Sequence, residues 1–257
     1  MNLIYKIAIL IFFSFYLVSC SDSSSNKLKK KKESNNNLTE FDNLISAINS
    51  RSDYIEGNSL CYDNNEYKKQ VKCYFDSREK SFAKIIFYKV EMNTGNIDHV
   101  SFFFYKGHVF SSKRYQEYGD SSNITRISTV SYYEKNKVIF SKEKSSKNTA
   151  LDKIEYKPCF KKEHNIEEAR QILDQKGHYQ TKFIQFHKID GMGLYMEVGE
   201  NIKGGYSAVL KIPENLKSDL MSINEKEIEG KKVMVEFDSK MIENDWYQNL
   251  ISYQFIE

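Results

Sequence analysis

The sequence predicts a mostly β protein of the α+β class, in which a short helix precedes an antiparallel meander and a second helix precedes a small five-stranded barrel. Three observations lead to this prediction. Tyr, Phe, Val and Ile recur at every second residue over much of the chain, the connectors between these segments are short, and helical spacing of apolar residues is confined to a few places. With 257 residues, 40% of them hydrophobic and 14% aromatic, the chain is able to bury a core.

The first folded domain is expected at residues 38–160. It starts with a helix that has Thr39 as its N-cap and Asp42 three residues later. The apolar residues of this helix fall at i, i+3, i+4 and i+7, which are Phe41, Leu44, Ile45 and Ile48. Such a stripe indicates packing against a core.

A change to a period of two predicts the strands of this domain. Seven are expected, at residues 71–75, 82–90, 97–105, 108–116, 124–133, 138–142 and 151–156. Their connectors contain Gly, Asn, Asp and Ser and are too short for a helical crossover. We therefore expect the strands to pair antiparallel in chain order, as a meander.

The second domain is expected at residues 161–257, after a boundary near Pro158. Asn165 and Glu168 predict the start of a helix that ends at Gly177. Strands are expected at 181–189, 193–198, 206–212, 232–237 and 247–256, with a short helix within 213–223. The order of three strands, a helix and two strands resembles an OB-fold barrel in topology and size. This resemblance does not select a ligand, because OB folds bind oligonucleotides, oligosaccharides or proteins.

Residues 1–19 have the pattern of an export signal. Lys6 is followed by about twelve mostly apolar residues, from Ile7 to Val18. A helix that crosses a membrane needs about 20 such residues, so this segment is too short for a permanent span.

The signal ends in Leu17-Val18-Ser19-Cys20, which resembles the lipobox of bacterial lipoproteins. The resemblance implies that the Cys20 thiol is diacylglycerylated, that the peptide is cut before it, and that the new N-terminus is acylated, for example with palmitate. Two or three acyl chains anchor a protein stably. The alternative is an ordinary secretory peptide with a chance cysteine. Ser21 resembles the signal for sorting to the outer membrane, which we therefore favour over the inner membrane.

Residues 20–37 are expected to be a disordered tether, since Leu28 is the one apolar residue after Cys20 in this polar stretch. Its lysines either contact anionic headgroups or are simply solvated. The first 33 residues hold six lysines and two acids, so residues 34–257 carry 32 basic and 33 acidic residues. The folded part is therefore nearly neutral, which argues against a nucleic-acid partner.

Three cysteines remain after Cys20. Cys61 and Cys73 flank a polar stretch that looks like the tip of a hairpin, so they are the disulfide candidate; the alternative is three unpaired thiols, including Cys159. The Cys and His residues lack zinc-finger spacing, and we expect no metal and no cofactor.

Motifs for catalysis are almost absent. The sequence has no GxSxG, P-loop, HExxH or EF-hand pattern. His164 and Glu168 are four residues apart, and with His178 and His187 they are the best candidate for an acid–base or metal cluster; Cys159 with His164 is the best candidate for a thiol nucleophile. Surface histidines and an inert thiol are the simpler interpretation. We therefore predict no enzyme activity and assign no catalytic residue.

Aromatic density is the remaining indication of function. Phe102-Phe103-Phe104-Tyr105 and Tyr132-Tyr133 place rings on both faces of predicted strands. Rings on a solvent face stack on sugars or anchor a protein partner, whereas buried rings only pack.

The resulting hypothesis is a lipid-anchored lipoprotein of the bacterial cell envelope that serves as a binding or structural module, for an envelope protein or a glycan. The alternatives are a small exported hydrolase with a His/Glu site, and an immunity or inhibitor protein that acts against toxins or lysozyme.

Overall fold

We describe the protein from a computed structural model, which covers residues 38–120, 122–242 and 245–256. The signal peptide, Cys20 and the tether therefore lie outside the described residues. The chain divides into two compact units, Met1–Asn49 and Ser50–Glu257. In the first unit, the predicted helix is present, because residues 38–50 are helical. Since residue 38 is already helical, Thr39 lies inside the helix and is not its N-cap.

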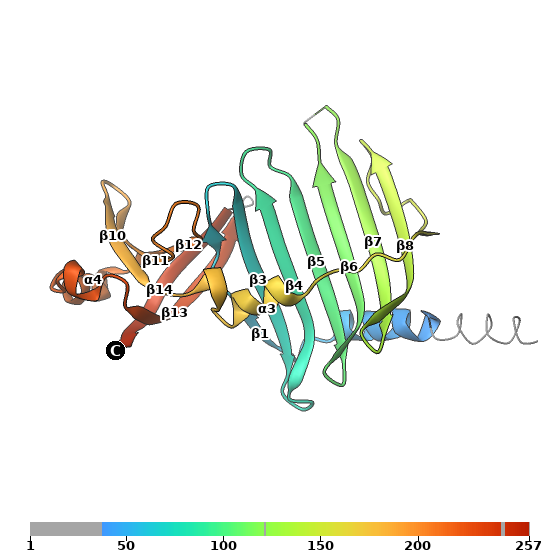
Figure 1. Cartoon of the computed structure of the whole chain (residues 1–257), viewed down its shortest axis with the longest axis horizontal. Helices are drawn as coiled ribbons and strands as arrows, with labels where there is room; N and C mark the ends of the chain where they lie inside the picture. Colours follow the sequence, from blue (N-terminus) through green and yellow to red (C-terminus); the bar gives the residue numbers. More distant parts are fainter. Residues whose placement is uncertain (1–37, 121, 243–244, 257) are drawn as a thin grey trace, which may run out of the picture. The chain divides into compact units, whose positions relative to one another are not determined.

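Most of the second unit is a long antiparallel meander, as predicted (Figure 1). Its six long strands pair with their neighbours in chain order; they are β3 (Tyr67–Asp76), β4 (Ser81–Glu91), β5 (Ile97–Tyr105), β6 (His108–Tyr118), β7 (Thr125–Glu134) and β8 (Lys137–Lys147). Only two residues, Lys106 and Gly107, connect β5 to β6. Lys106 and Gly107 both have positive φ, at 49° and 78°, which is the geometry of a two-residue hairpin turn.

Short strands complete the edges of the meander. β1 (Ile55–Asn58) and β2 (Tyr62–Asp63) both pair with β3, and β9 (Lys157–Pro158) pairs with β8. The predicted strand at residues 151–156 was wrong, because these residues form turns and bends. Leu151 in this segment is buried, so the apolar pattern there reflects packing of a loop.

The helix predicted after Asn165 is shorter than expected. α3 spans Glu167–Leu173, and a 3-10 turn, η1, spans Gly177–Tyr179. Asn165 does accept a hydrogen bond at the start of the helix, from the backbone N–H of Glu167 at 2.8 Å. Glu168 is not a capping partner, since its carboxylate is bonded to Lys69 and Tyr179.

The C-terminal strands follow the predicted order. They are β10 (Phe183–Ile189), β11 (Gly193–Gly199), β12 (Ser207–Ile212), β13 (Lys232–Ile242) and β14 (Asp245–Ile256), with α4 (Glu214–Met221) and α5 (Glu225–Ile228) between β12 and β13. β12 pairs with β11, with β14 and, through Ser207 and Asp63, with β2. All described strands therefore belong to one sheet. The sheet is not closed into a barrel, because β10 and β13 share only an isolated bridge, Lys182–Lys232.

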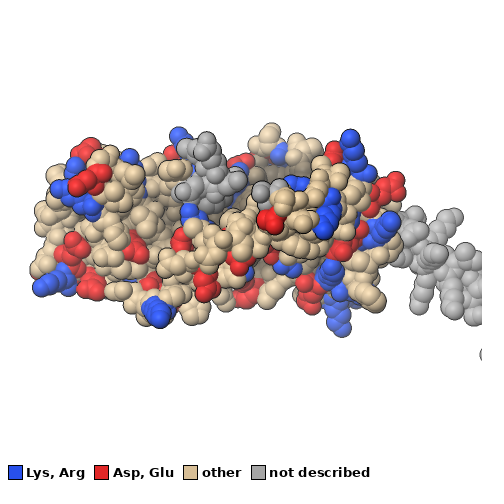
Figure 2. Space-filling model, turned by 90° about the horizontal axis from the view of Figure 1, so that it is seen from above, with Lys and Arg blue, Asp and Glu red and all other residues tan. Residues whose placement is uncertain are grey.

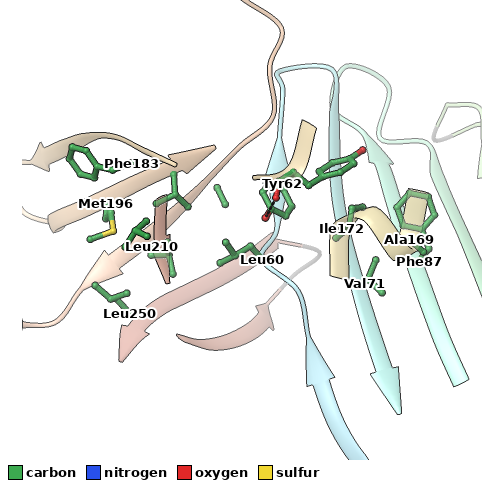
Figure 3. Packing of buried hydrophobic residues seen from close by; sticks show 14 of the residues in the cluster. Leu60, Tyr62, Val71, Phe87, Ala169, Ile172, Phe183, Met196, Leu210 and Leu250 are labelled. Atoms are coloured by element: carbon green, nitrogen blue, oxygen red, sulfur yellow. Dashed lines mark hydrogen bonds between the residues drawn. The ribbon is translucent and has the colours of Figure 1, made fainter. Parts of the chain in front are cut away.

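One hydrophobic core crosses the predicted domain boundary near residue 160. Phe183, Met196, Leu210 and Leu250 from the C-terminal strands lie in the same cluster as Val71 and Phe87 from the meander, with Leu60 and Tyr62 between them (Figure 3). Ala169 and Ile172 of α3 pack on the meander side, and α3 contacts β3 and β4. Residues 50–257 thus fold as one compact unit.

A buried lysine joins the parts of this unit. The Lys69 side chain on β3 is 7% exposed, and its Nζ donates to Glu168 of α3 at 2.6 Å, to Tyr179 of η1 at 3.2 Å, and to Tyr206 before β12. The hydroxyl of Tyr62 donates to the carbonyl of Tyr179 at 2.7 Å. Burial and the neighbouring Glu168 raise the pKa of Tyr179, so its hydroxyl stays protonated. We call Lys69, Glu168, Tyr179 and Tyr206 the Lys69 cluster.

Glu168→Gln is expected to lower the free energy of unfolding by about 1–3 kcal/mol, because the buried amino group of Lys69 then loses its carboxylate partner. This loss is smaller than that for a fully buried ion pair, since the Glu168 side chain is 40% exposed to solvent, which screens its charge. Chemical denaturation measures the change. The matched control is the exposed neighbour Glu167→Gln, and an equal effect of both variants would contradict the role of the cluster.

Candidate functional site

The predicted site residues are distributed over the molecule. Cys20 lies outside the described residues. Cys61 and Cys73 form no disulfide in the structure. Tyr62 pairs with Lys69 and Gly57 pairs with Cys73, so Cys61 lies next to position 70, about three residues or 10 Å along β3 from Cys73. This spacing exceeds the reach of a disulfide, whose Cα atoms are less than about 7 Å apart.

The thiols of Cys73 and Cys159 are not activated. Burial raises the pKa of both groups, so they stay protonated at neutral pH. The Sγ atom of Cys73 packs on the backbone of Gly57, where an added Cβ would lie only 3.0 Å away. The described hydrogen bonds of His164 are to Ser112 and Tyr133, and none of them involves Cys159. The geometry does not support a thiol nucleophile.

The histidines and Glu168 have separate partners. His178 contacts Glu200 at 3.1 Å, His187 contacts Glu197 at 2.6 Å, and Glu168 belongs to the Lys69 cluster. Among the described residues, no three His, Cys, Asp or Glu side chains lie close enough to hold a metal ion. The structure thus does not assemble the cluster that the sequence spacing suggested.

His164 lies at a cavity and belongs to a buried hydrogen-bond network. Its Nδ1 lies 2.8 Å from Oγ of Ser112, and that Oγ lies 2.9 Å from the hydroxyl of Tyr133. The hydroxyl of Tyr133 also accepts from the backbone N–H of His164 at 3.0 Å. A cavity of about 340 Å³ adjoins His164, with His108 and Arg170 in its wall. Ser112 is completely buried, so this serine–histidine pair fixes the segment before α3 to β6 and does not present a nucleophile.

The predicted aromatic surface is mostly core. Phe102, Phe103, Phe104 and Tyr133 are buried, and so is Tyr132, whereas Tyr105 is 51% exposed. Phe102 and Phe104 point to the side of the sheet that α3 helps to cover, where they join the main core. The runs of adjacent rings therefore do not form the binding surface.

The strand register instead assembles a different surface from residues that are far apart in sequence. Gln70, Tyr88, His99, Tyr115, Ser128 and Lys144 are successive cross-strand partners from β3 to β8. The next row consists of Lys72, Ile86, Ser101, Lys113, Val130 and Lys142. Direct partners point to the same side of a sheet, so these side chains share one face. We call it the lysine–aromatic face.

This face has an excess of positive charge. Besides Lys72, Lys113, Lys142 and Lys144, the same register places Lys68, Lys84 and Arg126 on it. Five acids share the face among the described strands β1–β8, fewer than the basic residues; they are Glu56, Asp63, Asp76, Glu117 and Glu134. Glu56 contacts Lys72 at 2.7 Å, Glu117 contacts Arg126 at 2.8 Å, and Asp76 contacts Arg51 at 2.8 Å. Adjacent strands lie about 4.8 Å apart, so the two rows extend about 24 Å from β3 to β8.

The lysines of this face repel one another. Burial lowers the pKa of Lys84, and the charges of Lys113 and Lys72 lower it further. Burial likewise lowers the pKa of Lys113, and Lys144 adds to the effect. A strip of like charges destabilises the folded state unless an opposite charge approaches it. The electrostatics of the face therefore favour an anionic ligand.

Aromatic rings lie in the row beside Lys72, Lys113 and Lys142. His99 lies between Tyr88 and Tyr115, with ring centroids 5.6 and 5.1 Å apart. All three rings are half-buried, so each leaves part of its surface open to solvent. The ammonium of Lys144 lies 4.8 Å from the centre of the Tyr156 ring, and that of Lys72 lies 5.0 Å from the Tyr74 ring. The face thus offers flat apolar rings and positive charges side by side.

The opposite face of the same strands is neutralised. Asp98 pairs with Arg114 at 2.9 Å, Lys69 with Glu168, and Glu143 with Lys162. Charged side chains elsewhere are also mixed in sign: basic and acidic residues are interspersed over the surface in the view from above (Figure 2). The imbalance of the lysine–aromatic face is therefore a local feature that the near-neutral total charge conceals.

Comparisons with protein-family models, with curated proteins and with solved structures find no match to this chain. Within the part of the chain that the structure describes, no helix has the length and apolarity needed to span a membrane.

His164 makes the stability of the fold depend on pH. Burial, followed by the nearby charge of Arg114, lowers its pKa to about 4, whereas an unfolded histidine titrates near 6.5. The stability that neutral His164 contributes is complete above pH ~6.5 and is lost as the pH falls toward about 4, because the unfolded chain binds the proton first.

We therefore expect the free energy of unfolding to decrease between pH 6.5 and 4, by an amount on the order of 1–3 kcal/mol from this residue. Denaturant titrations at several pH values measure it. In His164→Gln the decrease should be smaller, and in the exposed control His178→Gln it should match the wild type. An NMR titration in which His164 protonates near pH 6.5 would refute the assignment.

Proposed function

We propose that this protein is a lipid-anchored lipoprotein of the bacterial cell envelope that binds an anionic partner through the lysine–aromatic face. The excess of lysines on this one face is the observation that carries the binding role. The anchor is supported by the sequence Leu17-Val18-Ser19-Cys20, which resembles a lipobox, and by the polar tether after it. We favour the outer membrane because of Ser21.

The same proposal includes an OB-like barrel for the C-terminal strands. The order β10-β11-β12-β14-β13, with the helices between the third and fourth strands in sequence, supports it. Further support comes from backbone hydrogen bonds at the open seam: Phe183 donates to Lys231 and Val233 donates to Thr181, both at 2.8 Å. These two bonds belong to the isolated bridge Lys182–Lys232, so they join the two edges at one point. The barrel would serve as a platform next to the meander.

A binding role accounts for the site better than a hydrolase does. His164 and Glu168, the proposed acid–base pair, are bonded to Ser112 and Lys69. Each of these contacts holds a segment in place and leaves neither group in a shared site. The lysines of the face, in contrast, gain from a ligand that brings negative charge.

Cys20→Ala tests the anchor. If the thiol carries the lipid, this variant should incorporate no palmitate and should keep its signal peptide, since only a thiol forms the thioether. Metabolic labelling and the mass of the mature N-terminus are the measurements. Cys159→Ala is the control and should be labelled like the wild type; unchanged labelling of the Cys20 variant would exclude the anchor.

Lys113→Gln/Lys144→Gln tests the binding face. Full-length protein in detergent should bind dextran sulfate about tenfold more weakly with this change, because two charges on the face are lost. The control, Lys161→Gln/Lys231→Gln, removes the same charge from exposed residues outside the face and should change the affinity less than twofold. Biolayer interferometry measures both. Equal losses would mean that net charge, and not this face, governs binding.

A further inference from the structure

The lysine–aromatic face also indicates what kind of anion it takes. This inference rests on the proposed function, because it concerns the ligand of the same face. Three properties decide it: the length of the charged rows, the rings beside the lysines, and the depth of those rings.

The positive charges are spread out and not gathered in a pocket. Lys113 on β6 and Lys144 on β8 are two strands apart, about 10 Å, and Lys72 on β3 is about 14 Å from Lys113 on the other side. A small anion reaches one of these ammonium groups at a time. A linear polyanion that lies across the strands reaches several at once, and each contact after the first requires little additional loss of freedom.

The rings beside the lysines add a second requirement. Tyr88, His99 and Tyr115 form a ladder along the same direction as the charged row. An aromatic ring packs well on the apolar C–H face of a sugar, which is flat and of similar width. A polymer of acidic sugars presents such faces and carboxylates or sulfates in alternation, so it matches both the ladder and the lysines.

The depth of the rings argues against a lipid surface. Insertion into a bilayer requires apolar side chains that protrude from the protein. Tyr88, His99 and Tyr115 are half-buried, and Phe103 on the same face is fully buried. Such a face accepts a ligand that lies on it. On the described strands β3–β8, Tyr105 at the end of β5 is the one large apolar side chain of this face that is mostly exposed, at 51%, and a single ring is too little for insertion into a bilayer.

We propose that the lysine–aromatic face binds a linear acidic polysaccharide, laid across strands β4–β6 so that sugar rings stack on Tyr88, His99 and Tyr115 while its anionic groups contact Lys113 and, at the end of the site, Lys144. The site ends there because Tyr156 is bonded to Ser128 at 2.7 Å and Lys144 also donates to the carbonyl of Leu151 at 2.7 Å. Charge and ring stacking then act together. Tyr115 is the most informative ring, since its hydroxyl is also bonded to Glu117 at 2.6 Å and the two parts of its side chain can be separated by substitution.

The test measures binding of full-length protein in detergent to polygalacturonate, which has carboxylates on sugar rings, and to polyphosphate, which has charge without rings. We expect Tyr115→Ser to weaken polygalacturonate binding about fivefold or more and to leave polyphosphate binding unchanged. Tyr115→Phe keeps the ring and should bind polygalacturonate within twofold of the wild type. Neutral dextran should not bind. Thermal unfolding of each variant verifies that it is folded.

The other outcomes overturn the inference in distinguishable ways. If polyphosphate binds as well as polygalacturonate and Tyr115→Ser affects neither, the face is an electrostatic surface for any polyanion; the proposed function then stands and the sugar does not. If Lys113→Gln/Lys144→Gln changes adsorption to phosphatidylglycerol vesicles but not polygalacturonate binding, the ligand is a membrane. If no polyanion binding depends on these lysines, the proposed function fails as well.

Discussion

The Lys69 ammonium, buried where the meander meets the C-terminal strands, has to be neutralised for the fold to form. Its partners come from three places in the chain: Glu168 on α3, Tyr179 on η1 and Tyr206 before β12. A buried charge without a partner costs several kcal/mol, so the arrangement of these three segments is tied to one atom. The continuous core and the pairing of β12 with β2 are consistent with this junction, because both require the two halves of the sheet to meet there.

The two faces of the meander differ in how their charged side chains are paired. On the face that α3 helps to cover, acids and bases pair, as in Asp98–Arg114 and Glu143–Lys162. On the lysine–aromatic face, basic residues outnumber the acids and lysines lie near one another. Repulsion between like charges lowers the stability of the folded protein. Such clusters are typical of surfaces that bind a ligand of opposite charge. This difference between the faces is the physical basis of the binding proposal.

The sequence anticipated the strands of the meander well, because alternation of Tyr, Phe, Val and Ile with polar residues is a local signal. It failed at residues 151–156, where Leu151 is buried by a loop, and at Glu168, whose expected role as a capping partner was replaced by a contact with Lys69. Both errors have the same cause. Leu151 and Glu168 fit a strand and a helix cap locally, but in the folded protein Leu151 is buried in a loop and Glu168 bonds to Lys69, which is distant in sequence. The adjacent rings at 102–105 suggested a binding surface because neighbours on a strand point to opposite faces. In the structure three of these four rings are buried.

By itself, the sequence determined the class of the fold, the order of its elements and the expectation of a lipid anchor at Cys20, all of which depend on short stretches of chain. Only the tertiary structure decided that the two predicted domains share one sheet and one core, that Cys61 and Cys73 lie too far apart for a bond, and that Lys113 and Lys144 share a face with Tyr88, His99 and Tyr115. The reason is register. Alternation within a strand shows which residues of that strand share a face of the sheet. The pairing of the strands then decides which side chains from different strands become neighbours on that face.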